Sequence, residues 1–555
     1  MNPRPLTSDL SVSTQISATD VASLKALGYG SIVCHRPDGE ASDQPNFEEI
    51  AQAARQAGLQ AVHQPVVPGH ASAEQAEGFA ALCAELAKPI LAYCRTGTRS
   101  ATLWALSQAD KLPIAEIQER AAKAGFDLKA VVQRIANAGK APVEVVDAEH
   151  TVVIVGGGAA GIAVASSLRA REPELDIAII DPADVHYYQP GWTLVGAGVF
   201  QAASTARTMA SRVPAGVRWL KAAVVAFEPE RNAVVLEGCR VVRYQRLVVC
   251  PGLKIDWHGI DGLVETLGRN GVTSNYRFDL APYTWEQVRA LRGGKALFTQ
   301  PPMPIKCAGA PQKAMYLSCD TWRRNGTLKD TQVQFFNAGA VLFGVPDYVP
   351  ALMEYVKTYG IGLRFGHTLK RIDGPRRRAT FMRAMPDGSK EMVDTDFDMI
   401  HVVPPQTAPD FVRASPLADA AGWVDVDPAS LRHKTYTNIY ALGDVSNTAN
   451  AKTAAAARKQ APVVAHNILA SLSYAVGQAQ YDGYGSCPLT VERGKVVLAE
   501  FLYGGKVAPS FPAWLIDGTK PSRAAWFLKE RILPPLYWDG MLKGREWMAQ
   551  PALVD

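Results

Sequence analysis

Two patterns of hydrophobic positions alternate along the first 110 residues. Short apolar runs have the length and β-branched content of buried strands: GSIVCHRP (30–37), QAVHQPV (60–66) and PILAYC (89–94). Segments between them repeat apolar residues at helical spacing: ATDVASLKALGY (18–29), NFEEIAQAARQAGL (46–59) and SAEQAEGFAALCAELA (72–87). The alternation predicts a small α/β domain with a reactive loop at the C-terminal end of a strand. A helical tail is expected to end near residue 137, followed by a linker.

A second pattern starts at residue 150, where HTVVIVGGGAAGIAVASSLRAREPELDIAIID predicts a strand, a glycine loop, a helix and another strand. Gly156, Gly158 and Gly161 form G-x-G-x-x-G, and Asp181 ends the second strand about 20 residues later. Such glycines let the backbone approach a pyrophosphate, and an acid at this spacing binds ribose. The segment therefore predicts a dinucleotide site.

A late segment narrows the choice of dinucleotide. NIYALGDVSNTANAKTAAAARKQA (438–461) predicts a strand that ends at Gly443-Asp444, before a helix of small residues. It resembles the second flavin-binding motif of flavoproteins with two dinucleotide domains, in which the aspartate bonds the ribityl chain. Asp444 could also simply cap the helix. We expect FAD, bound by these residues and by Lys452 of the same segment.

The middle of the chain lacks the second glycine fingerprint that a nicotinamide cofactor needs. The strand KALFTQ (295–300) instead enters PPMPIKCAGAPQKAMYLSCDTW (301–322), and prolines supply no backbone N–H donors. This loop offers Cys307, whose thiolate Lys306 could stabilise. Cys307 is thus a candidate catalytic residue, although free cysteines are often only buried packing residues.

Composition limits the class of protein. The 555 residues require two or three domains, and 48% hydrophobic with 20% charged residues is typical of a folded protein. A net charge of +5 gives no case for nucleic-acid binding. Eight cysteines without regular spacing do not indicate a disulfide framework, and we assign no metal site. We expect neither a secretory signal nor a spanning helix.

Several stretches resemble type II sulfide:quinone oxidoreductases, a family of flavoproteins on the disulfide-reductase fold. They are HYYQPGWTLVGAG (186–198), PIKCAGAPQKAMYLSCD (304–320), GDVSNTANAKTAAA (443–456), YDGYGSCPLTVERGKVVLAEFLYGG (481–505) and LPPLYWDGMLKG (533–544). The resemblance implies that sulfide is oxidised to a cysteine-bound persulfide, that FAD takes two electrons, and that a membrane quinone is reduced.

The chain departs from some members of that family at one position. Val445 stands where they carry a second redox cysteine. Cys250, Cys319 or Cys487 could replace it, but nothing in the sequence places any of them beside Cys307. We expect Cys487 to be structural.

The C-terminal region combines tryptophans with basic residues, and Pro534-Pro535 is expected to break its helix. This pattern fits an amphipathic segment lying in a membrane interface, or equally an aromatic core or dimer helix. The resemblance favours peripheral membrane attachment, and Phe501, Tyr503 or Trp538 could line a quinone slot. We expect the protein to be cytoplasmic and peripheral on the inner face of the cell membrane.

The loop CRTGTR (94–99) is the candidate site of the N-terminal domain. Only four residues separate Cys94 from Arg99, whereas phosphatase loops have five, and Ser100 holds the arginine position of the longer loop. The shorter loop is similar to that of rhodanese sulfurtransferases and suits a persulfide or sulfite better than a phosphate. The surrounding domain resembles the phosphatase-fold domain joined to persulfide-handling hydrolases of the β-lactamase-hydrolase-like family. Arg95 and Arg99 would stabilise the Cys94 thiolate and bind an anion.

We therefore expect a bifunctional sulfur enzyme of mixed α/β fold. Its predicted parts are a phosphatase-fold sulfurtransferase-like domain (1–137), a linker (138–149), an FAD-dependent core of two interleaved dinucleotide-type domains (150–480) and a quinone- and membrane-facing segment (481–555). Sulfide, quinone and a thiol or sulfite acceptor are the expected partners, with a possible homo-oligomer. The alternatives are an NAD(P)H:quinone oxidoreductase fused to a phosphatase-like domain, or an N-terminal persulfide or anion sensor.

Overall fold

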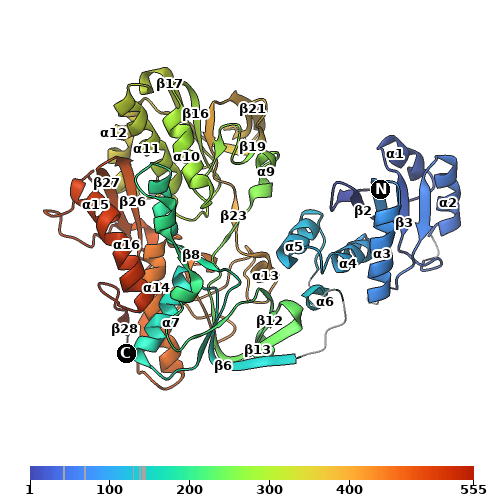
Figure 1. Ribbon diagram of the computed structural model, residues 1–555, viewed down its shortest axis with the longest axis horizontal. Helices are drawn as coiled ribbons and strands as arrows, with labels where there is room; N and C mark the ends of the chain where they lie inside the picture. Colours follow the sequence, from blue (N-terminus) through green and yellow to red (C-terminus); the bar gives the residue numbers. More distant parts are fainter. Residues whose placement is uncertain (42–43, 68–70, 129–130, 137–138, 140–144, 555) are drawn as a thin grey trace. The chain divides into compact units, whose positions relative to one another are not determined.

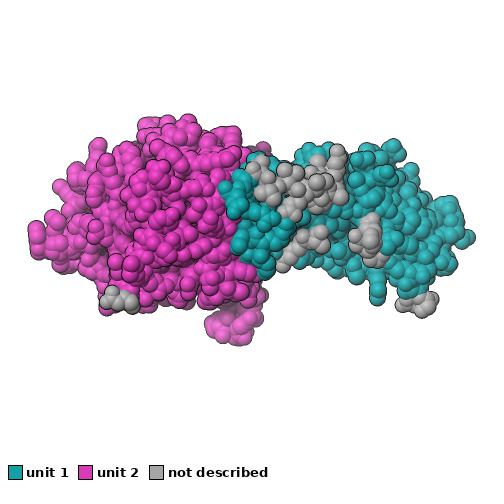
Figure 2. Space-filling model, turned by 90° about the horizontal axis from the view of Figure 1, so that it is seen from below, with its two compact units in different colours: residues 1–149, 222–243, 410–416 teal, residues 150–221, 244–409, 417–555 magenta. Residues whose placement is uncertain are grey.

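The chain folds into two compact units, coloured separately in Figure 2. A computed structural model describes every residue except 42–43, 68–70, 129–130, 137–138, 140–144 and 555. Unit 1 comprises residues 1–149, 222–243 and 410–416, and unit 2 comprises residues 150–221, 244–409 and 417–555. Residues 140–144 of the predicted linker lie outside the described part, and the predicted domain boundaries stay predictions.

The N-terminal part of unit 1 is built on a five-stranded sheet in the order β1-β2-β5-β3-β4, in which only β1 runs antiparallel. Its strands are β1 (Arg4–Pro5), β2 (Leu10–Ser13), β3 (Ser31–Cys34), β4 (Gln60–His63) and β5 (Ile90–Tyr93). Its helices are α1 (Asp20–Ala26), α2 (Phe47–Gln56), α3 (Ala73–Glu85), α4 (Thr98–Ser107), α5 (Ile114–Lys123) and α6 (Val132–Ala136). The central strands β5 and β3 are buried along their whole length, which explains their continuous apolar runs. The predicted α/β domain is confirmed.

Two later segments of the chain complete unit 1. Strands β11 (Val224–Glu228) and β12 (Ala233–Leu236) pair antiparallel, and β12 continues the ladder onto the start of β13 (Arg240–Val249). Val225 and Val235 share one apolar cluster with Phe126 and Ile135. The other later segment, residues 410–416, contains helix α13 (Asp410–Arg413).

The first sheet of unit 2 carries the predicted glycine loop. Its strands run in the order β10-β7-β6-β13, with β24 also pairing with β13 in parallel. The bounds are β6 (Val145–Val155), β7 (Ile177–Ile180), β10 (Arg218–Leu220) and β24 (Ile439–Ala441). Helices α7 (Ala159–Arg171) and α14 (Ala454–Ser471) follow the two predicted flavin motifs and pack on each other. Both motifs therefore reach the same end of one sheet (Figure 1).

The second sheet of unit 2 is fully parallel, in the order β15-β22-β16-β17-β18. Its strands are β15 (Val272–Thr273), β16 (Gly294–Gln300), β17 (Thr331–Asn337), β18 (Gly362–Phe365) and β22 (Met399–His401). The helices are α10 (Leu280–Ala290), α11 (Ala310–Asn325) and α12 (Val349–Tyr359). An antiparallel sheet is formed by β19 (His367–Asp373), β20 (Arg378–Ala384) and β21 (Lys390–Asp396), and a hairpin by β26 (Gly485–Glu492) and β27 (Lys495–Phe501). Side chains of α11 and of the hairpin share one apolar cluster.

Short elements connect these sheets. They are α8 (Trp192–Val195), α9 (Leu263–Thr266), β8 (Val185–Tyr187), β9 (Ala206–Thr208), β14 (Lys254–Ile255), β23 (Gln406–Thr407), β25 (Gln478–Gln480) and β28 (Ala552–Val554).

The C-terminal segment stays helical through its prolines, so the predicted break at Pro534-Pro535 is wrong. Helix α15 (Arg523–Phe527) continues through a π-helical turn (Leu528–Ile532), α16 (Leu533–Pro535) and a second π-helical turn (Leu536–Gly540). Wider turns on both sides change the hydrogen-bond register, which accommodates residues lacking an N–H. Among the described residues, no helix is long and apolar enough to cross a membrane.

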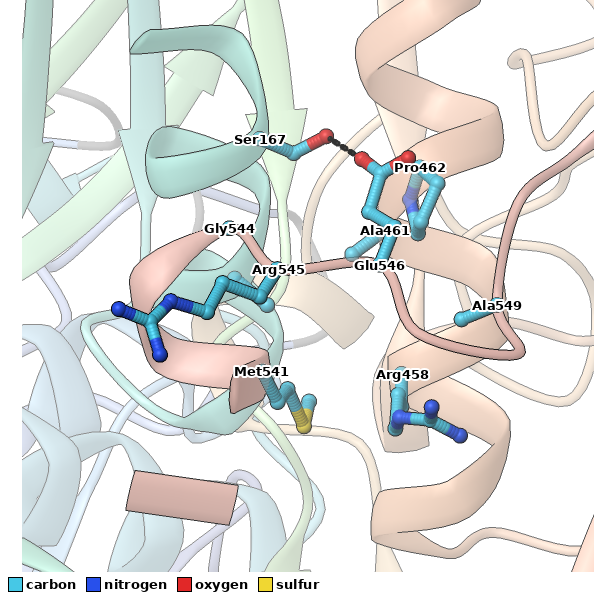
Figure 3. Close-up of a pocket in the computed structure, with 10 residues that line it drawn as sticks. Ser167, Arg458, Ala461, Pro462, Met541, Gly544, Arg545, Glu546 and Ala549 are labelled. Carbon is cyan, nitrogen blue, oxygen red and sulfur yellow. Dashed lines mark hydrogen bonds between the residues drawn. The ribbon is translucent and has the colours of Figure 1, made fainter. Parts of the chain in front are cut away.

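The same segment is tied to the nucleotide helix α7. The Ser167 hydroxyl donates to Glu546 at 2.6 Å, as Figure 3 shows, and the Arg171 guanidinium donates to both carboxylate oxygens of Glu546. The Ser166 hydroxyl donates to the carbonyl of Leu542 at 2.8 Å. These bonds hold the C-terminal segment against the helix that follows the glycine loop.

Candidate active site

The three predicted glycines surround the start of α7. Gly156 has φ of 109°, and a Cβ there would lie 2.5 Å from the carbonyl oxygen of Cys250. Gly158 is the N-cap of α7 and faces open space, while a Cβ on Gly161 would collide with the backbone of Gly156. The loop therefore requires glycine at positions 156 and 161, and the open space at Gly158 leaves room for a pyrophosphate at the helix N-terminus.

Asp181 lies at the end of β7 and faces this loop. Its carboxylate accepts hydrogen bonds from the backbone N–H groups of Gly157 at 2.6 Å and Ala183 at 2.8 Å. Burial raises the pKa of Asp181, and the two N–H donors oppose that shift. The acid thus orders the glycine loop and also lines the adjoining cavity.

The second predicted motif lines the same cavity. Gly443 has φ of 74°, and its N–H donates to the Gln460 side chain at 2.8 Å. The Lys452 ammonium donates to the carbonyls of Asp444 at 2.7 Å and Ser446 at 2.9 Å. Burial lowers the pKa of Lys452 to about 8. Its ammonium therefore shapes the backbone around Asp444.

One cavity of about 910 Å³ joins these residues to Cys307 and to an apolar end. Gly156, Asp181, Asp444 and Cys307 all border it. Its apolar end is lined by Phe511, Leu528, Ile532, Leu533, Leu536 and Trp547. A glycine cradle without Cβ atoms, followed by a long cavity, fits a bulky dinucleotide such as FAD.

Cys307 lies where β16 leads into α11, in a left-handed conformation with φ of 52°. A non-glycine residue in this region costs about 1–3 kcal/mol, and such residues concentrate at functional sites. The backbone N–H of Cys307 donates to the carbonyl of Lys452 at 2.9 Å, which joins the cysteine loop to the second flavin motif. Helix α11 begins three residues later, so its N-terminus favours negative charge near this sulfur.

Two groups touch the Cys307 sulfur. The Sγ of Cys487, on strand β26, lies 3.6 Å away, and the Nζ of Lys313, in the first turns of α11, lies 3.1 Å away. A Cβ on Gly309 would lie 2.4 Å from the Cys487 sulfur. The sulfurs can therefore approach each other only because residue 309 has no side chain.

The charges around the two sulfurs separate their pKa values. The Cys487 thiol donates to the Cys307 sulfur and the Lys313 ammonium lies beside it, so the pKa of Cys307 is well below its ordinary value although burial opposes this. The same hydrogen bond and burial raise the pKa of Cys487. Burial and the repulsion of Lys313 lower the pKa of a second buried lysine, Lys529, to about 7. Cys307 is thus the thiolate and Cys487 the thiol.

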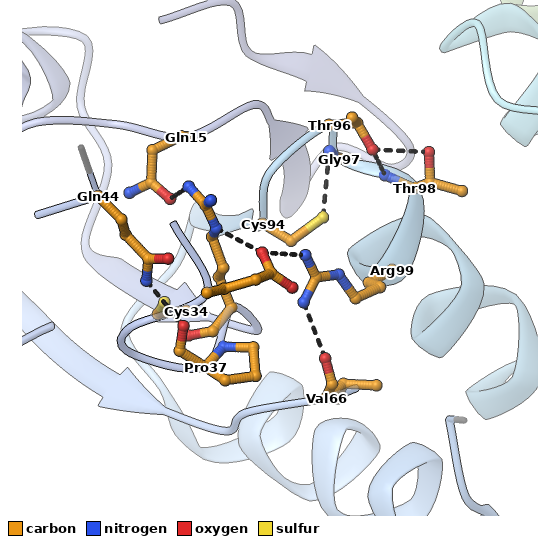
Figure 4. A network of polar contacts seen from close by, with 12 residues as sticks. Gln15, Cys34, Pro37, Gln44, Val66, Cys94, Thr96, Gly97, Thr98 and Arg99 are labelled. Atoms are coloured by element: carbon orange, nitrogen blue, oxygen red, sulfur yellow. Dashed lines mark hydrogen bonds and ion pairs between the residues drawn. The ribbon is translucent and has the colours of Figure 1, made fainter. Parts of the chain in front are cut away.

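In the N-terminal domain, Cys94 follows β5 directly and is fully buried. Its sulfur accepts a hydrogen bond from the backbone N–H of Gly97 at 3.2 Å (Figure 4). Gly97 has φ of 89°, and a Cβ there would lie 2.9 Å from the Phe126 ring. The loop therefore wraps its backbone around the sulfur and leads into α4.

The loop arginine is engaged by the protein itself. The Arg99 guanidinium donates to the carbonyl of Val66 and to the Glu40 carboxylate, both at 2.9 Å. The Ser100 hydroxyl hydrogen-bonds the buried His35 ring at 2.9 Å, and burial lowers the pKa of His35 to about 3. His35 is thus neutral and holds the loop through its hydrogen bond with Ser100.

Comparison with known proteins assigns unit 2. Residues 150–292 match the family described as pyridine nucleotide-disulphide oxidoreductase. The mitochondrial sulfide:quinone oxidoreductase of Dictyostelium discoideum is 42% identical over 407 residues, which are 73% of this chain and 88% of that protein. The chain belongs to the sulfide:quinone oxidoreductase family. The solved sulfide:quinone oxidoreductase of Aquifex aeolicus, at 19% identity, covers 72% of this chain and 92% of that one with a TM-score of 0.59, which shows the shared fold.

A second family accounts for the N-terminus. Residues 2–111 match the phosphatase-like domain of the beta-lactamase hydrolase-like protein. The protein of that name from Agrobacterium fabrum is 32% identical over 126 residues, which are 22% of this chain and 29% of that protein. The predicted fusion of this domain to a sulfide:quinone oxidoreductase is confirmed, and the family indicates an FAD-binding flavoprotein.

Two expectations about the sulfide:quinone oxidoreductase site need correction. Cys487, which the sequence led us to regard as structural, has its sulfur 3.6 Å from that of Cys307. Lys306, expected beside the thiolate, instead donates to the Gln189 side chain. Sequence reasoning missed Lys313 and Lys529.

The aromatic residues of the C-terminal region predicted to line a quinone slot do not line the cavity. Phe501, Tyr503 and Trp538 are absent from the described lining of the cavity, and Trp538 packs against His186 at 5.8 Å between ring centres. Exposed apolar side chains gather in the same region instead: Trp514 (84% exposed), Phe527 (58%), Trp547 (54%) and Ile532 (43%). Two of them, Ile532 and Trp547, also line the apolar end of the cavity.

Proposed function

We propose that the chain oxidises sulfide and passes the electrons through FAD to a quinone. The observation that carries the proposal is the sulfur pair Cys307–Cys487, 3.6 Å apart beside Lys313, in the cavity bounded by both flavin motifs. The related proteins named above are sulfide:quinone oxidoreductases. Gly156, Gly158, Gly161, Asp181, Gly443, Asp444 and Lys452 are the residues proposed to hold FAD. When bound, FAD supplies the two-electron acceptor between the cysteine pair and the quinone.

The unequal pKa values set the direction of the sulfur chemistry. In the oxidised enzyme the two sulfurs are joined, which requires them to close from 3.6 Å to about 2.05 Å. Hydrosulfide attacks Cys487, the S–S bond breaks, and Cys307 leaves as a thiolate, because the thiol of lower pKa is the better leaving group. The electron pair of the broken S–S bond stays on the Cys307 sulfur, and the sulfane sulfur is held as a persulfide on Cys487. The persulfide is thus proposed on Cys487 rather than on Cys307.

The apolar end of the cavity suits a lipid-dissolved quinone. The exposed aromatic and aliphatic side chains beside it favour peripheral attachment to a membrane interface. The Dictyostelium relative is named as mitochondrial, so attachment to the inner face of the cell membrane, like a homo-oligomer, stays a prediction.

The N-terminal domain is proposed to accept sulfane sulfur on Cys94. The Cys94 thiolate attacks the terminal sulfur of a hydropersulfide R–S–SH, R–S⁻ leaves, and Cys94 carries the new persulfide. A thiol then takes that sulfur and restores the Cys94 thiolate. Cys94 is thereby the nucleophile and Arg99 the residue that orders the loop.

Mass spectrometry of the cysteines during sulfide turnover tests the whole proposal. Native protein should reduce quinone with sulfide and show a persulfide on Cys487. Both Cys307→Ser and Cys487→Ser should lose quinone reduction, whereas Cys94→Ser should retain it and lose sulfur transfer to a thiol. Flavin reduction by NADH but not by sulfide would refute the proposal.

A further inference from the structure

Two guanidinium groups in the N-terminal domain converge on one carboxylate oxygen. The Oε2 of Glu40 accepts from the Nε of Arg36 at 2.6 Å and from Arg99 at 2.9 Å. Arg36 is buried and also donates to the Gln15 side chain at 2.9 Å. Figure 4 shows this network beside the Cys94 loop. Glu40 thus holds the two arginines in place.

The carboxylate is charged at neutral pH. The hydrogen bond from Arg99 lowers the pKa of Glu40, burial opposes the shift, and Arg36 adds to it. Glu40 therefore occupies donors of the Arg99 guanidinium that an anionic ligand would otherwise use. A ligand dianion must either displace it or approach it as a like charge.

Glu40 also limits the total charge of the site. Two guanidinium groups and one carboxylate leave a single positive charge, and the remaining loop cation, Arg95, is exposed to solvent. The other Glu40 oxygen, Oε1, is buried and has no hydrogen-bond partner among the described residues. That oxygen can accept a hydrogen bond from a ligand that still carries a proton, such as a thiol or a hydropersulfide. An oxyanion without a proton can only be repelled by Oε1 of Glu40.

We propose that Glu40 is the specificity-determining residue of the Cys94 site, which admits hydropersulfides and other sulfur carriers of at most one negative charge and rejects dianions. The excluded class comprises phosphate, phosphate monoesters and thiosulfate. This inference rests on the proposed sulfur transfer at Cys94 and names its substrate class. On this proposal the domain has a phosphatase-like fold but is closed to phosphate, because Arg99 of its loop already binds a carboxylate.

Inorganic phosphate titrated into the full-length protein at pH 8, followed by calorimetry, tests the exclusion directly. Glu40→Gln keeps the shape of the side chain and removes its charge, so phosphate should bind at least tenfold more tightly than to native protein. Glu40→Asp keeps the charge and should bind phosphate as weakly as native protein. Glu48→Gln is the matched control, because Glu48 pairs with Arg55 on the exposed face of α2. Glu40→Ala repeats the test if Glu40→Gln does not fold.

A kinetic comparison addresses the substrate class. The KM for thiosulfate as sulfur donor should fall at least fivefold in Glu40→Gln relative to the KM for cysteine persulfide. Phosphate binding that is unchanged in both Glu40→Gln and Glu40→Ala would overturn the proposal, as would an equal gain in Glu48→Gln. The binding experiment does not depend on turnover, so failure of the Cys94→Ser test would refute sulfur transfer without deciding the role of Glu40.

Discussion

Replacing Gly309 by alanine should separate the two cysteines while leaving both in place. The new Cβ would lie 2.4 Å from the Cys487 sulfur and 2.5 Å from a methyl carbon of Leu489. Ordinary van der Waals contact begins near 3.4 Å, so the Cys487 sulfur must retreat by about 1 Å. Since closure to a disulfide requires about 2.05 Å, the sulfurs would start further from the reactive distance than the present 3.6 Å.

The expected cost falls mainly on activity. A misplacement of about 1 Å between reacting groups can cost about 10²-fold in rate, whereas overpacking of this size destabilises the fold by about 1–3 kcal/mol. We expect kcat/KM for sulfide to fall about 10²-fold, and titration of free thiols after mild oxidation to show a loss of the Cys307–Cys487 disulfide.

Gly344→Ala is the matched control, because a Cβ at Gly344 meets no atom within 4 Å. This variant should keep native turnover and disulfide yield. If Gly309→Ala oxidises sulfide at the native rate and forms the disulfide in full, the inferred packing of Gly309 against Cys487 does not matter for catalysis.

Three further predictions follow from charged groups at the two sites. Lys313→Met removes a charged hydrogen bond worth about 1.5–3 kcal/mol, so the pKa of Cys307 should rise. Sulfide oxidation at pH 7 should then fall at least tenfold, with Lys313→Arg partly retaining activity. The ammonium of Lys529, with its pKa lowered to about 7, is present below that pH and lost above it; the ratio of native to Lys529→Met kcat/KM for sulfide should therefore fall as pH rises from 6 to 8, and a flat ratio would contradict this. Burial lowers the pKa of His35 from 6.5 to about 3, so on acidification the unfolded state takes up the proton first. Between pH 7.5 and 5.5 the free energy of unfolding of the N-terminal domain should therefore fall by about 1.4 kcal/mol more in native protein than in His35→Gln. Hydrogen exchange of the β5 amides measures this difference.

The signals within short segments predicted most of the architecture. Both flavin motifs are local patterns of glycine and acid between a strand and a helix, so the sequence indicated Gly156 and Asp444 as cofactor residues, and both line the cavity. Lys313 was also within reach of sequence reasoning. It lies in the early turns of a helix that starts just after Cys307, and helical side chains point back toward the N-terminus.

The partner of Cys307 could not be found in the same way. Cys487 is 180 residues away on a hairpin strand, and only the packing of that hairpin against α11 brings it to the site. No local pattern distinguishes a cysteine that packs from one that faces another sulfur. The role of Glu40 was hidden for the same reason, since it meets Arg99 from a separate loop.

The surroundings of the two reactive cysteines explain why one chain needs both. Cys307 has a second sulfur 3.6 Å away, so this pair can hold two electrons as a dithiol and release them toward the cofactor cavity when it closes to a disulfide. The nearest strand-end thiol to Cys94, that of Cys34 on β3, donates instead to the carbonyl of Arg36 at 3.4 Å, and burial raises its pKa. A thiol held in this way is a poor partner for disulfide formation. This setting is consistent with the proposed role of Cys94, which receives and releases sulfur without forming a disulfide with Cys34.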